Sequence, residues 1–261
     1  MNPLLFQVII PFLLSALVVI FIMFIAERYG TKTGGIIGTL PSTIVVAFLF
    51  IAFNQGVTFA AQSVAVVPAE LGINLIFLFL FAILVHRSVL GAFLASFLVW
   101  TLLSSLLFLF QIDNILISLG IFALSLLITF PILERVKQIP SAKQVAVHYT
   151  LRKIALRGTL AGIVIAIAVL LSNLGAILSG IFSVFPAIFS STMLISVKEH
   201  GTDFAAGIAK SMAIGLSSVL IYATVIHFLY PLSGLLIGTI VAYAFSLCFT
   251  LLLFSLRGKL K

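Results

Sequence analysis

The sequence predicts an all-α integral membrane protein with about nine transmembrane helices, arranged as two inverted four-helix repeats joined by a spacer helix. Three observations lead to this fold class: the composition, the placement of the basic residues and an internal repeat. Of the 261 residues, 63% are hydrophobic and only 8% are charged, whereas a soluble domain carries about 25% charged residues. The composition therefore favours a chain that lies mostly in a lipid bilayer.

Nine apolar stretches are each long enough to cross a bilayer as a helix, which takes about 20 residues. They cover roughly residues 4–26, 34–53, 58–85, 88–110, 114–133, 154–172, 176–197, 202–229 and 232–256. The first stretch follows no basic segment and is longer than the apolar part of a signal peptide, so we expect it to be retained. The connections are short except for the polar residues 134–153, which we interpret as the linker between two halves.

The basic residues lie on one side of the membrane when nine spans are counted. Arg87 follows the third span, Lys198 the seventh and Arg257 the ninth. The loops on the other side, 53–57, 111–113, 172–175 and 230–231, contain neither Lys nor Arg. Because basic loops stay in the cytoplasm, we expect a multi-pass protein of the plasma (inner) membrane, with its N-terminus outside and its C-terminus in the cytoplasm. The basic residues that give the net charge of +8 thus serve to orient the chain in the membrane, and no nucleic-acid partner is expected.

Two segments of the chain match each other without a gap at an offset of 145 residues. The offset pairs Gly35 with Gly180, Pro41 with Pro186, Gly56 with Gly201, and Phe59-Ala60-Ala61 with Phe204-Ala205-Ala206. We therefore expect repeats over residues 1–111 and 151–261, with a spacer helix and a cytoplasmic loop in 112–150. With nine spans, the first repeat begins outside and the second begins inside, so the repeats are inverted. Inverted repeats are typical of secondary transporters.

The second repeat also contains short motifs that occur in a known family. From Asn173 to about Lys259 the chain reads LSGIFSVFPAIFSS, then KEHG, with predicted spans on both sides. Through Gly180, Pro186, Glu199 and Gly201, this segment resembles the GlpM-like family of small four-span inner-membrane proteins. The first repeat resembles the family more weakly, because Asn54-Gln55 stands where the family pattern has an acidic residue. The resemblance implies that a four-span unit can exist alone and pair antiparallel, and that this chain is a fused pair.

The two matched prolines indicate a binding site. A proline inside a helix removes a backbone hydrogen bond and clashes with the preceding turn, and a broken membrane helix exposes backbone groups to a cavity. Such a break directs a positive helix N-terminus at an anion, or carbonyls at a cation. The alternative is an ordinary kink in which Ser and Thr bond back to the backbone. The candidate substrate- or ion-binding residues are Thr39, Pro41, Ser42, Thr43, Pro186, Ser190, Ser191 and Thr192.

Glu70 and Lys210 are the ionisable residues that we place deepest in predicted spans. A charge in hydrocarbon costs at least about 2.5–3.5 kcal/mol, which makes such a residue a functional candidate. At about 1.5 Å per residue, the two side chains reach similar levels from opposite surfaces. We expect them to form an ion pair or a proton-coupled switch. The alternatives are a purely structural pair, or a Lys210 side chain that extends to the inner surface.

Polar residues also cluster at two turns related by the repeat. They are Asn54, Gln55 and Gln62 in the first half, and Glu199, His200 and Asp203 in the second. If the turns fold inward, these residues gate the cavity or hold a cation. The alternative is an interfacial turn in which Asp203 caps the helix that follows.

The leading functional hypothesis is a secondary transporter for an ion or small solute, driven by an ion or proton gradient, with its site between the two proline-containing helices. The alternatives are a channel-like pore, a lipid-handling protein, or a membrane anchor or accessory protein for a peripheral enzyme. The sequence contains no nucleophile motif, phosphate-binding loop or metal-ligand spacing, so we expect no enzyme activity, catalytic residue, metal or cofactor. The expected partners are the bilayer and the small substrate, and a homo-oligomer is left open.

Overall fold

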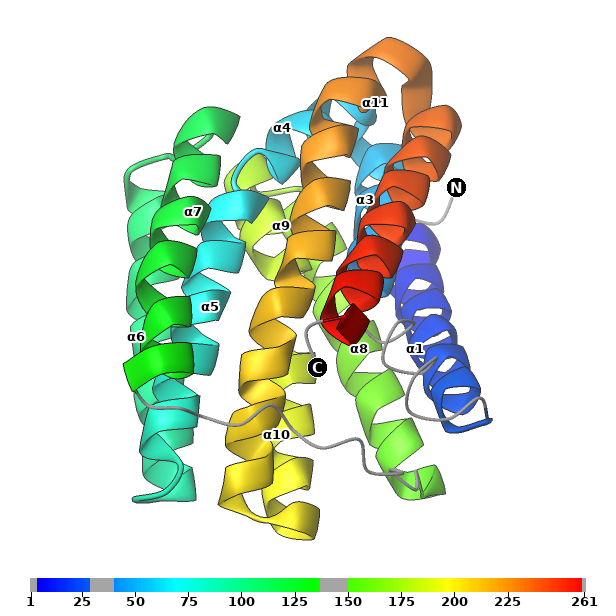
Figure 1. The fold of residues 1–261 in the computed structure, drawn as a ribbon. Helices are drawn as coiled ribbons and strands as arrows, with labels where there is room; N and C mark the ends of the chain where they lie inside the picture. Colours follow the sequence, from blue (N-terminus) through cyan, green and yellow to red (C-terminus); the bar gives the residue numbers. More distant parts are fainter. Residues whose placement is uncertain (1–3, 29–39, 137–149, 260–261) are drawn as a thin grey trace.

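The computed structural model describes residues 4–28, 40–136 and 150–259, and every regular element in these ranges is helical. The helices are α1 (Ile10–Arg28), α3 (Ser42–Gln55), α4 (Val57–Val64), α5 (Val67–Leu84), α6 (Val89–Leu109), α7 (Ile115–Pro131), α8 (Leu151–Leu171), α9 (Ala176–Ser183), α10 (Ala187–His200) and α11 (Thr202–Lys259). Short π-helical segments precede α1 (Leu5–Ile9) and follow α7 (Ile132–Val136). Together the helices form one bundle, with most axes roughly parallel or antiparallel (Figure 1).

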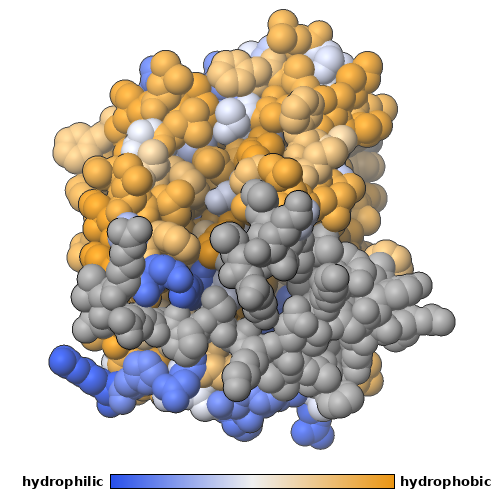
Figure 2. Space-filling model, in the orientation of Figure 1, coloured by the Kyte–Doolittle hydropathy of each residue, from blue (hydrophilic) through white to orange (hydrophobic). Residues whose placement is uncertain are grey.

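The described residues contain seven helical stretches that are long and apolar enough to cross a membrane. They are Leu5–Ile22, Val57–Leu84, Val89–Leu109, Ile115–Glu134, Leu151–Leu171, Ala176–His200 and Thr202–Leu253. Apolar side chains cover most of the visible upper part of the bundle, and hydrophilic ones gather at its lower end (Figure 2). The prediction of an all-α, multi-pass membrane protein is confirmed.

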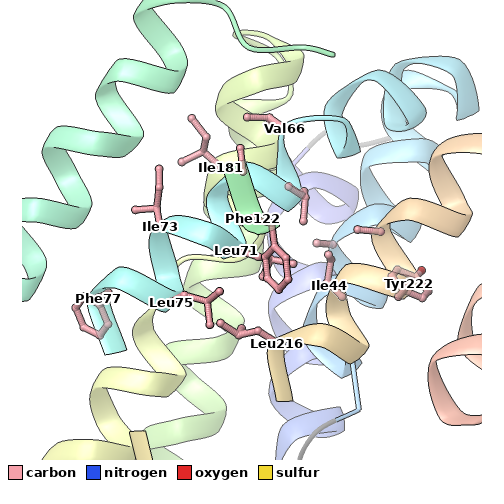
Figure 3. Packing of buried hydrophobic residues seen from close by; sticks show 14 of the residues in the cluster. Ile44, Val66, Leu71, Ile73, Leu75, Phe77, Phe122, Ile181, Leu216 and Tyr222 are labelled. Atoms are coloured by element: carbon pink, nitrogen blue, oxygen red, sulfur yellow. The ribbon is translucent and has the colours of Figure 1, made fainter. Parts of the chain in front are cut away.

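Helix α5 lies at the centre of the bundle. It packs against α6, α7 and α11, and most of its residues are buried. Side chains from α3, α7, α9 and α11, such as Ile44, Phe122 and Leu216, surround Leu71 and Leu75 of α5 (Figure 3). Two polar residues, Glu70 and Asn74, stand in this helix with no exposed surface. Because α5 is enclosed, their polar atoms depend on partners within the protein, and among the described residues Glu70 Oε2 and Asn74 Oδ1 have none.

Several of the long apolar stretches are interrupted. Helices α4 and α5 meet at Ala65-Val66, and Val184, Phe185 and Pro186 separate α9 from α10. In α11, Gly234 has a φ of 76°, which lies outside the helical region and which glycine adopts without strain. The chain reverses direction near this residue, so that α11 consists of two helices side by side (Figure 1). Several of the seven apolar stretches are therefore not single straight helices.

Helices α3 and α10 have the same local design. Each has 14 residues, begins directly after a proline and ends at a glycine with positive φ, 91° at Gly56 and 85° at Gly201. An L-residue at either glycine would be strained. From the interior of the bundle, α3 runs to one end and α10 runs to the other (Figure 1). The 145-residue offset in sequence thus relates two helices with the same local structure and opposite directions.

The hydrogen bonds of α8 confirm these opposite directions. Near the C-terminal end of α8, Ser172 and Asn173 accept hydrogen bonds from Gln55, the last residue of α3, at 3.3 and 2.8 Å. Near the N-terminal end of α8, Lys153 forms an ion pair with Glu199, which is close to the end of α10. Since α8 is a continuous helix, α3 and α10 end at opposite ends of the bundle.

Candidate functional site

A cavity of about 290 Å³ lies where α3 and α10 begin. Its wall includes the first turns of both helices, Pro41 to Ile44 and Ala187 to Phe189. Residues of α1, α5, α8, α9 and α11, further residues beside the starts of α3 and α10, and the segment between α9 and α10 complete it. They are Val19, Ile22, Leu40, Leu71, Arg157, Ala161, Val164, Ile165, Ser183, Val184, Phe185, Thr192, Met212, Gly215, Leu216 and Val219. A cavity therefore lies between the two proline-led helices, where the sequence analysis expected a site.

The first turn of each helix lines this cavity. The first four N–H groups of an α-helix have no acceptor within the helix. In α10, Ser190 donates its amide to the Pro186 carbonyl at 2.9 Å. The amides of Ile188 and Phe189 have no backbone acceptor in the described part of the chain, and both residues line the cavity. The N-terminal ends of α3 and α10, which lie at the cavity, are thus the positive ends of two helix dipoles.

Several carbonyl groups at the α9–α10 break accept hydrogen bonds from the protein. Val184 and Phe185 donate their amides to the carbonyls of Ile181 and Phe182, and Ala187 donates to the Phe185 carbonyl at 2.8 Å. The Val184 carbonyl accepts a hydrogen bond of 2.9 Å from the side-chain amide of Asn74 on α5. Each of these four carbonyl groups thus accepts a hydrogen bond within the protein and keeps a second lone pair.

Asn74 is a residue that the sequence analysis missed. It is fully buried and holds the broken segment against the central helix. The only signal in the sequence is a single amide side chain within an apolar run, and that signal does not tell which backbone group the amide binds.

The predicted hydroxyl residues divide into two groups. Ser42, Thr43 and Thr192 line the cavity together with Pro41. Ser190, Ser191 and Pro186 do not line it, and Thr39 lies outside the described residues. The hydroxyls of Ser190, Ser191 and Thr192 donate to carbonyls of Pro186 and Ile188, at 2.7–3.0 Å. On α10, the hydroxyls thus bond back to the backbone, as the alternative interpretation expected.

Arg157 on α8 is the charged residue in the cavity wall, and the sequence analysis did not select it. Its exposed fraction is 8%. In the sequence it follows the basic residues Arg152 and Lys153. However, Arg157 shares a helix face with Ala161 and Val164, which also line the cavity, because residues four and seven apart lie on one face of a helix. This spacing was the available signal.

Glu70 does not line the cavity, although its neighbour Leu71 does. Its carboxylate accepts a hydrogen bond of 2.9 Å from the hydroxyl of Ser104 on α6. One turn earlier on α6, Trp100 packs edge-on against Phe185 at a centroid distance of 4.9 Å. Glu70 is therefore connected to the α9–α10 break indirectly, because Ser104 and Trp100 of α6 contact Glu70 and Phe185 respectively.

Lys210 has a different partner from the one that we expected. Its ammonium lies 2.5 Å from a carboxylate oxygen of Glu134, which follows α7 and is half exposed. The expected Glu70–Lys210 ion pair is replaced by two separate interactions on different helices. The depth estimate placed both residues at one level, but it contained no information about which neighbour each side chain faces.

The polar turn residues lie at the two ends of the bundle and do not line the cavity. The Asn54 side chain donates to Phe50 of its own helix at 2.8 Å, and Gln55 binds the end of α8. Gln62 lines a second cavity of about 370 Å³ together with His227 and other residues. At the opposite end, Glu199 pairs with Lys153, Asp203 with His86 at 3.4 Å, and His200 packs against Phe204.

Within the described residues, no group of three or more His, Cys, Asp and Glu side chains could hold a metal ion. No family model matches the chain, and neither a curated protein nor a solved structure matches it. The resemblance to the GlpM-like family stays a prediction.

Proposed function

We propose that the chain is a secondary transporter that moves an ion or small solute through the cavity between α3 and α10. The observation that supports this most strongly is the pair of proline-led helices that begin at one cavity and run in opposite directions. Helices that break at a central site and derive from inverted repeats are the design of many secondary transporters.

In this proposal the chain crosses the membrane nine times. The repeat offset pairs α1 with α8, α3 with α10, the α4–α5 segment with the first half of α11, and α6 with the second half of α11. Helix α7 is the spacer. The paired helices α1 and α8 pack against each other, as do α5 and α11. The positive-inside rule places the end that carries Lys153, Lys198 and Arg87 in the cytoplasm.

Alternating access would then open the cavity to one end of the bundle at a time. At one end, the contacts to be broken are the side chains of Gln7, Gln55 and Asn173, which bond one another. At the other end the contact between the repeats is the His86–Asp203 ion pair. Partly exposed ion pairs contribute about 0–1 kcal/mol each. Such contacts are weak enough to open and close as one repeat rocks against the other.

Glu70 is the coupling residue in this proposal. A carboxyl group enclosed within membrane helices is a typical element of a proton relay. Its hydrogen bond to Ser104 and the contact of Trp100 with Phe185 connect it to the break. A change in its protonation would therefore act on the segment that shapes the cavity.

The direct test is uptake by liposomes that contain the purified full chain. The probes are radiolabelled acetate, phosphate, glycine and rubidium, supplied with and without a proton gradient. We expect saturable uptake of at least one probe. The Val164→Phe variant fills part of the cavity and should abolish uptake, whereas Ile163→Phe, whose site is 44% exposed on the outside of the same helix, should retain it.

Uptake no faster than in protein-free liposomes for all four probes would contradict the proposal, and would favour the anchor or accessory function. Ion currents far above the turnover rate of a carrier would show that the chain is a pore and not a carrier. Equal uptake by both phenylalanine variants would show that the cavity is not on the transport path.

A further inference from the structure

We infer that Glu70 and Asn74 form a binding site for one proton, in which the protonated Oε2 of Glu70 donates a hydrogen bond to Oδ1 of Asn74. Proton binding can be measured without transport, whereas its use to drive uptake rests on the proposed function. The inference names the ion that drives transport, where the sequence left both an ion gradient and a proton gradient open.

The first observation is a pair of buried oxygen atoms on the central helix α5. Oε2 of Glu70 and Oδ1 of Asn74 have no hydrogen-bond partner among the described residues, and neither side chain has exposed surface. Buried polar atoms are nearly always hydrogen-bonded, so each unpaired one requires an explanation. Residues four apart are neighbours on the surface of a helix. An ionised Glu70 would therefore place two acceptors on the same face of α5 with no donor for either.

The second observation is that neighbouring segments hold the other polar atom of each side chain. Oε1 of Glu70 accepts a hydrogen bond of 2.9 Å from the Ser104 hydroxyl on α6. Nδ2 of Asn74 donates to the Val184 carbonyl at 2.9 Å. Because a carbonyl oxygen only accepts, the Asn74 amide must present its nitrogen to Val184, and its oxygen remains free. A single proton on Oε2 of Glu70 turns that atom into a donor and satisfies both unpaired oxygens.

The third observation is the charge around Glu70. None of the ion pairs among the described residues includes it. Helices α4, α6, α7 and α9, which pack against α5, contain no titratable side chain. On the first half of α11, Lys210 pairs with Glu134. The other titratable groups there have neighbours of their own: Asp203 with His86, His227 with the Ala61 carbonyl, and Tyr222 and Tyr230 beside Thr239. A charge enclosed by apolar helices is costly unless it is paired, and a proton removes the charge of Glu70.

Asn74 links the bound proton to the α9–α10 break. Its side chain would accept from Glu70 with the oxygen while it donates to Val184 with the nitrogen. Hydrogen bonds that follow one another in a buried chain strengthen each other. Loss of the proton would turn two acceptors toward each other, and a rotation of the Asn74 amide away from Glu70 would release the Val184 carbonyl. Val184 lines the cavity, so the shape of the cavity wall depends on the proton.

A metal cation such as sodium is the alternative ligand, because it would also satisfy two acceptors. Neither Glu70 nor Asn74 lines either of the two cavities described above. A proton requires no cavity, whereas hard cations such as Mg²⁺ and Ca²⁺ take about six or more oxygen ligands. The packing around the two residues therefore favours the proton, and the experiment compares it directly with sodium.

The chain contains a natural reporter for this site. Trp100 is its only tryptophan and stands one turn before Ser104 on α6. Its indole N–H is close to the Glu70 carboxyl group without a hydrogen bond of normal geometry, and its ring packs against Phe185 in the break. We would follow Trp100 fluorescence of the purified full chain in an uncharged detergent against pH, in sodium chloride and in choline chloride. The pH range is the one in which circular dichroism shows the chain to be folded.

We expect one reversible fluorescence step with the same midpoint in both salts. Glu70→Gln should show no step, and its emission should match that of the native chain at low pH. The glutamine amide can donate to Asn74 while its oxygen accepts from Ser104, as in the protonated carboxyl group. Glu134→Gln, which changes a half-exposed carboxyl group, is the matched control and should keep the step.

Three results would overturn the proton site. They are a native chain without a step, a step that persists in Glu70→Gln, and a midpoint that depends on sodium. The last result would assign the two oxygens to a metal cation instead.

A second variant tests the part of Asn74. Asn74→Leu should weaken proton binding about tenfold, which moves the midpoint by about one pH unit, because the bound proton loses its acceptor. Asn54→Leu, whose amide donates within α3, should leave the midpoint unchanged. If Asn74→Leu does not fold, infrared difference spectra of the native chain decide the question. They should contain a carboxyl band that Glu70→Gln lacks, at the frequency of a carboxyl group that donates a hydrogen bond. An unchanged midpoint in Asn74→Leu, or the band of a free carboxyl group, would contradict the contact with Asn74.

The two proposals fail in different ways. A fluorescence step that depends on Glu70, without uptake of any probe by proteoliposomes, would contradict the transport function and leave the proton site standing. Saturable uptake by a chain whose fluorescence step persists in Glu70→Gln would leave transport standing and overturn the proton site.

Discussion

The side-chain amide of Asn74 donates a hydrogen bond of 2.9 Å to the carbonyl of Val184, which joins the central helix α5 to the break between α9 and α10. Both residues belong to the part of the bundle that shapes the cavity, since Val184 lines it. The contact satisfies a backbone group that the break leaves without its helical partner. It also explains how an irregular segment can persist inside an apolar bundle.

Replacing Asn74 with Leu should destabilise the fold by about 1–3 kcal/mol, because a buried carbonyl loses its donor. The measurement is equilibrium unfolding of the purified protein in mixed micelles. The matched control is Asn54→Leu, because the Asn54 amide donates within its own helix at the end of the bundle. Equal losses in the two variants would show that the Val184 contact has no special role.

Glu70→Gln should fold normally, because glutamine keeps an oxygen that can accept the Ser104 hydrogen bond. It cannot release or take up a proton, so uptake should no longer respond to an imposed proton gradient. The readout is the ratio of uptake with and without the gradient in proteoliposomes. Ser104→Ala, which leaves the carboxyl group in place, should keep a ratio above one. A native ratio in Glu70→Gln would exclude Glu70 as the coupling residue.

The energetic partner of Lys210 should be Glu134 and not Glu70. A double-mutant cycle with Lys210→Met and Glu134→Gln should give a coupling energy of about 0.5–1 kcal/mol, since one partner is half exposed. The cycle with Lys210→Met and Glu70→Gln should give a value near zero. The measurement is again unfolding in mixed micelles. A larger coupling to Glu70 would restore the pair that the sequence suggested.

Gly180 lies directly against the backbone of Ser63 on α4, where an added Cβ would overlap the Ser63 carbonyl oxygen. Gly180→Ala should therefore destabilise the fold by about 1–3 kcal/mol, as overpacking does. Gly120→Ala on α7 is the matched control, because nothing lies within 4 Å of its Cβ position. The control should be neutral or slightly stabilising, since alanine favours the helix. Thermal unfolding in detergent compares them, and similar midpoints would contradict the close approach.

The ends of several helices were predictable from the sequence because local interactions determine them. The stretch 88–110 becomes α6, Val89–Leu109, whose cap is the Ser88 side chain accepting from the amide of Gly91 at 3.1 Å. Similarly, Asn114 caps α7. The length of an apolar run shows how long a membrane helix is, and a cap residue at its start shows where the helix begins. Both can be read directly from the sequence.

The contacts of the candidate site were less predictable, because they depend on how helices are rotated against each other. The sequence analysis expected both prolines inside broken helices; α3 and α10 begin directly after them, and Ser42, Thr43 and Thr192 line the cavity there. By contrast, Lys210 was placed by depth alone, and Arg157 was not selected. Rise per residue gives the depth of a side chain, but only tertiary packing decides that Lys210 faces Glu134 and that Arg157 faces the cavity.

The most direct test of alternating access around this cavity is the reactivity of one cysteine at Thr192, in a chain whose native Cys248 is replaced by Ala. Thr192 lines the cavity, and Cys248 is exposed on the outside of the bundle. Sealed, oriented vesicles would be treated with a membrane-impermeant maleimide from either side. The account predicts labelling of T192C from both sides, and labelling of H200C, at the exposed end of α10, from one side only. Labelling of T192C from one side only, or from neither, would contradict it.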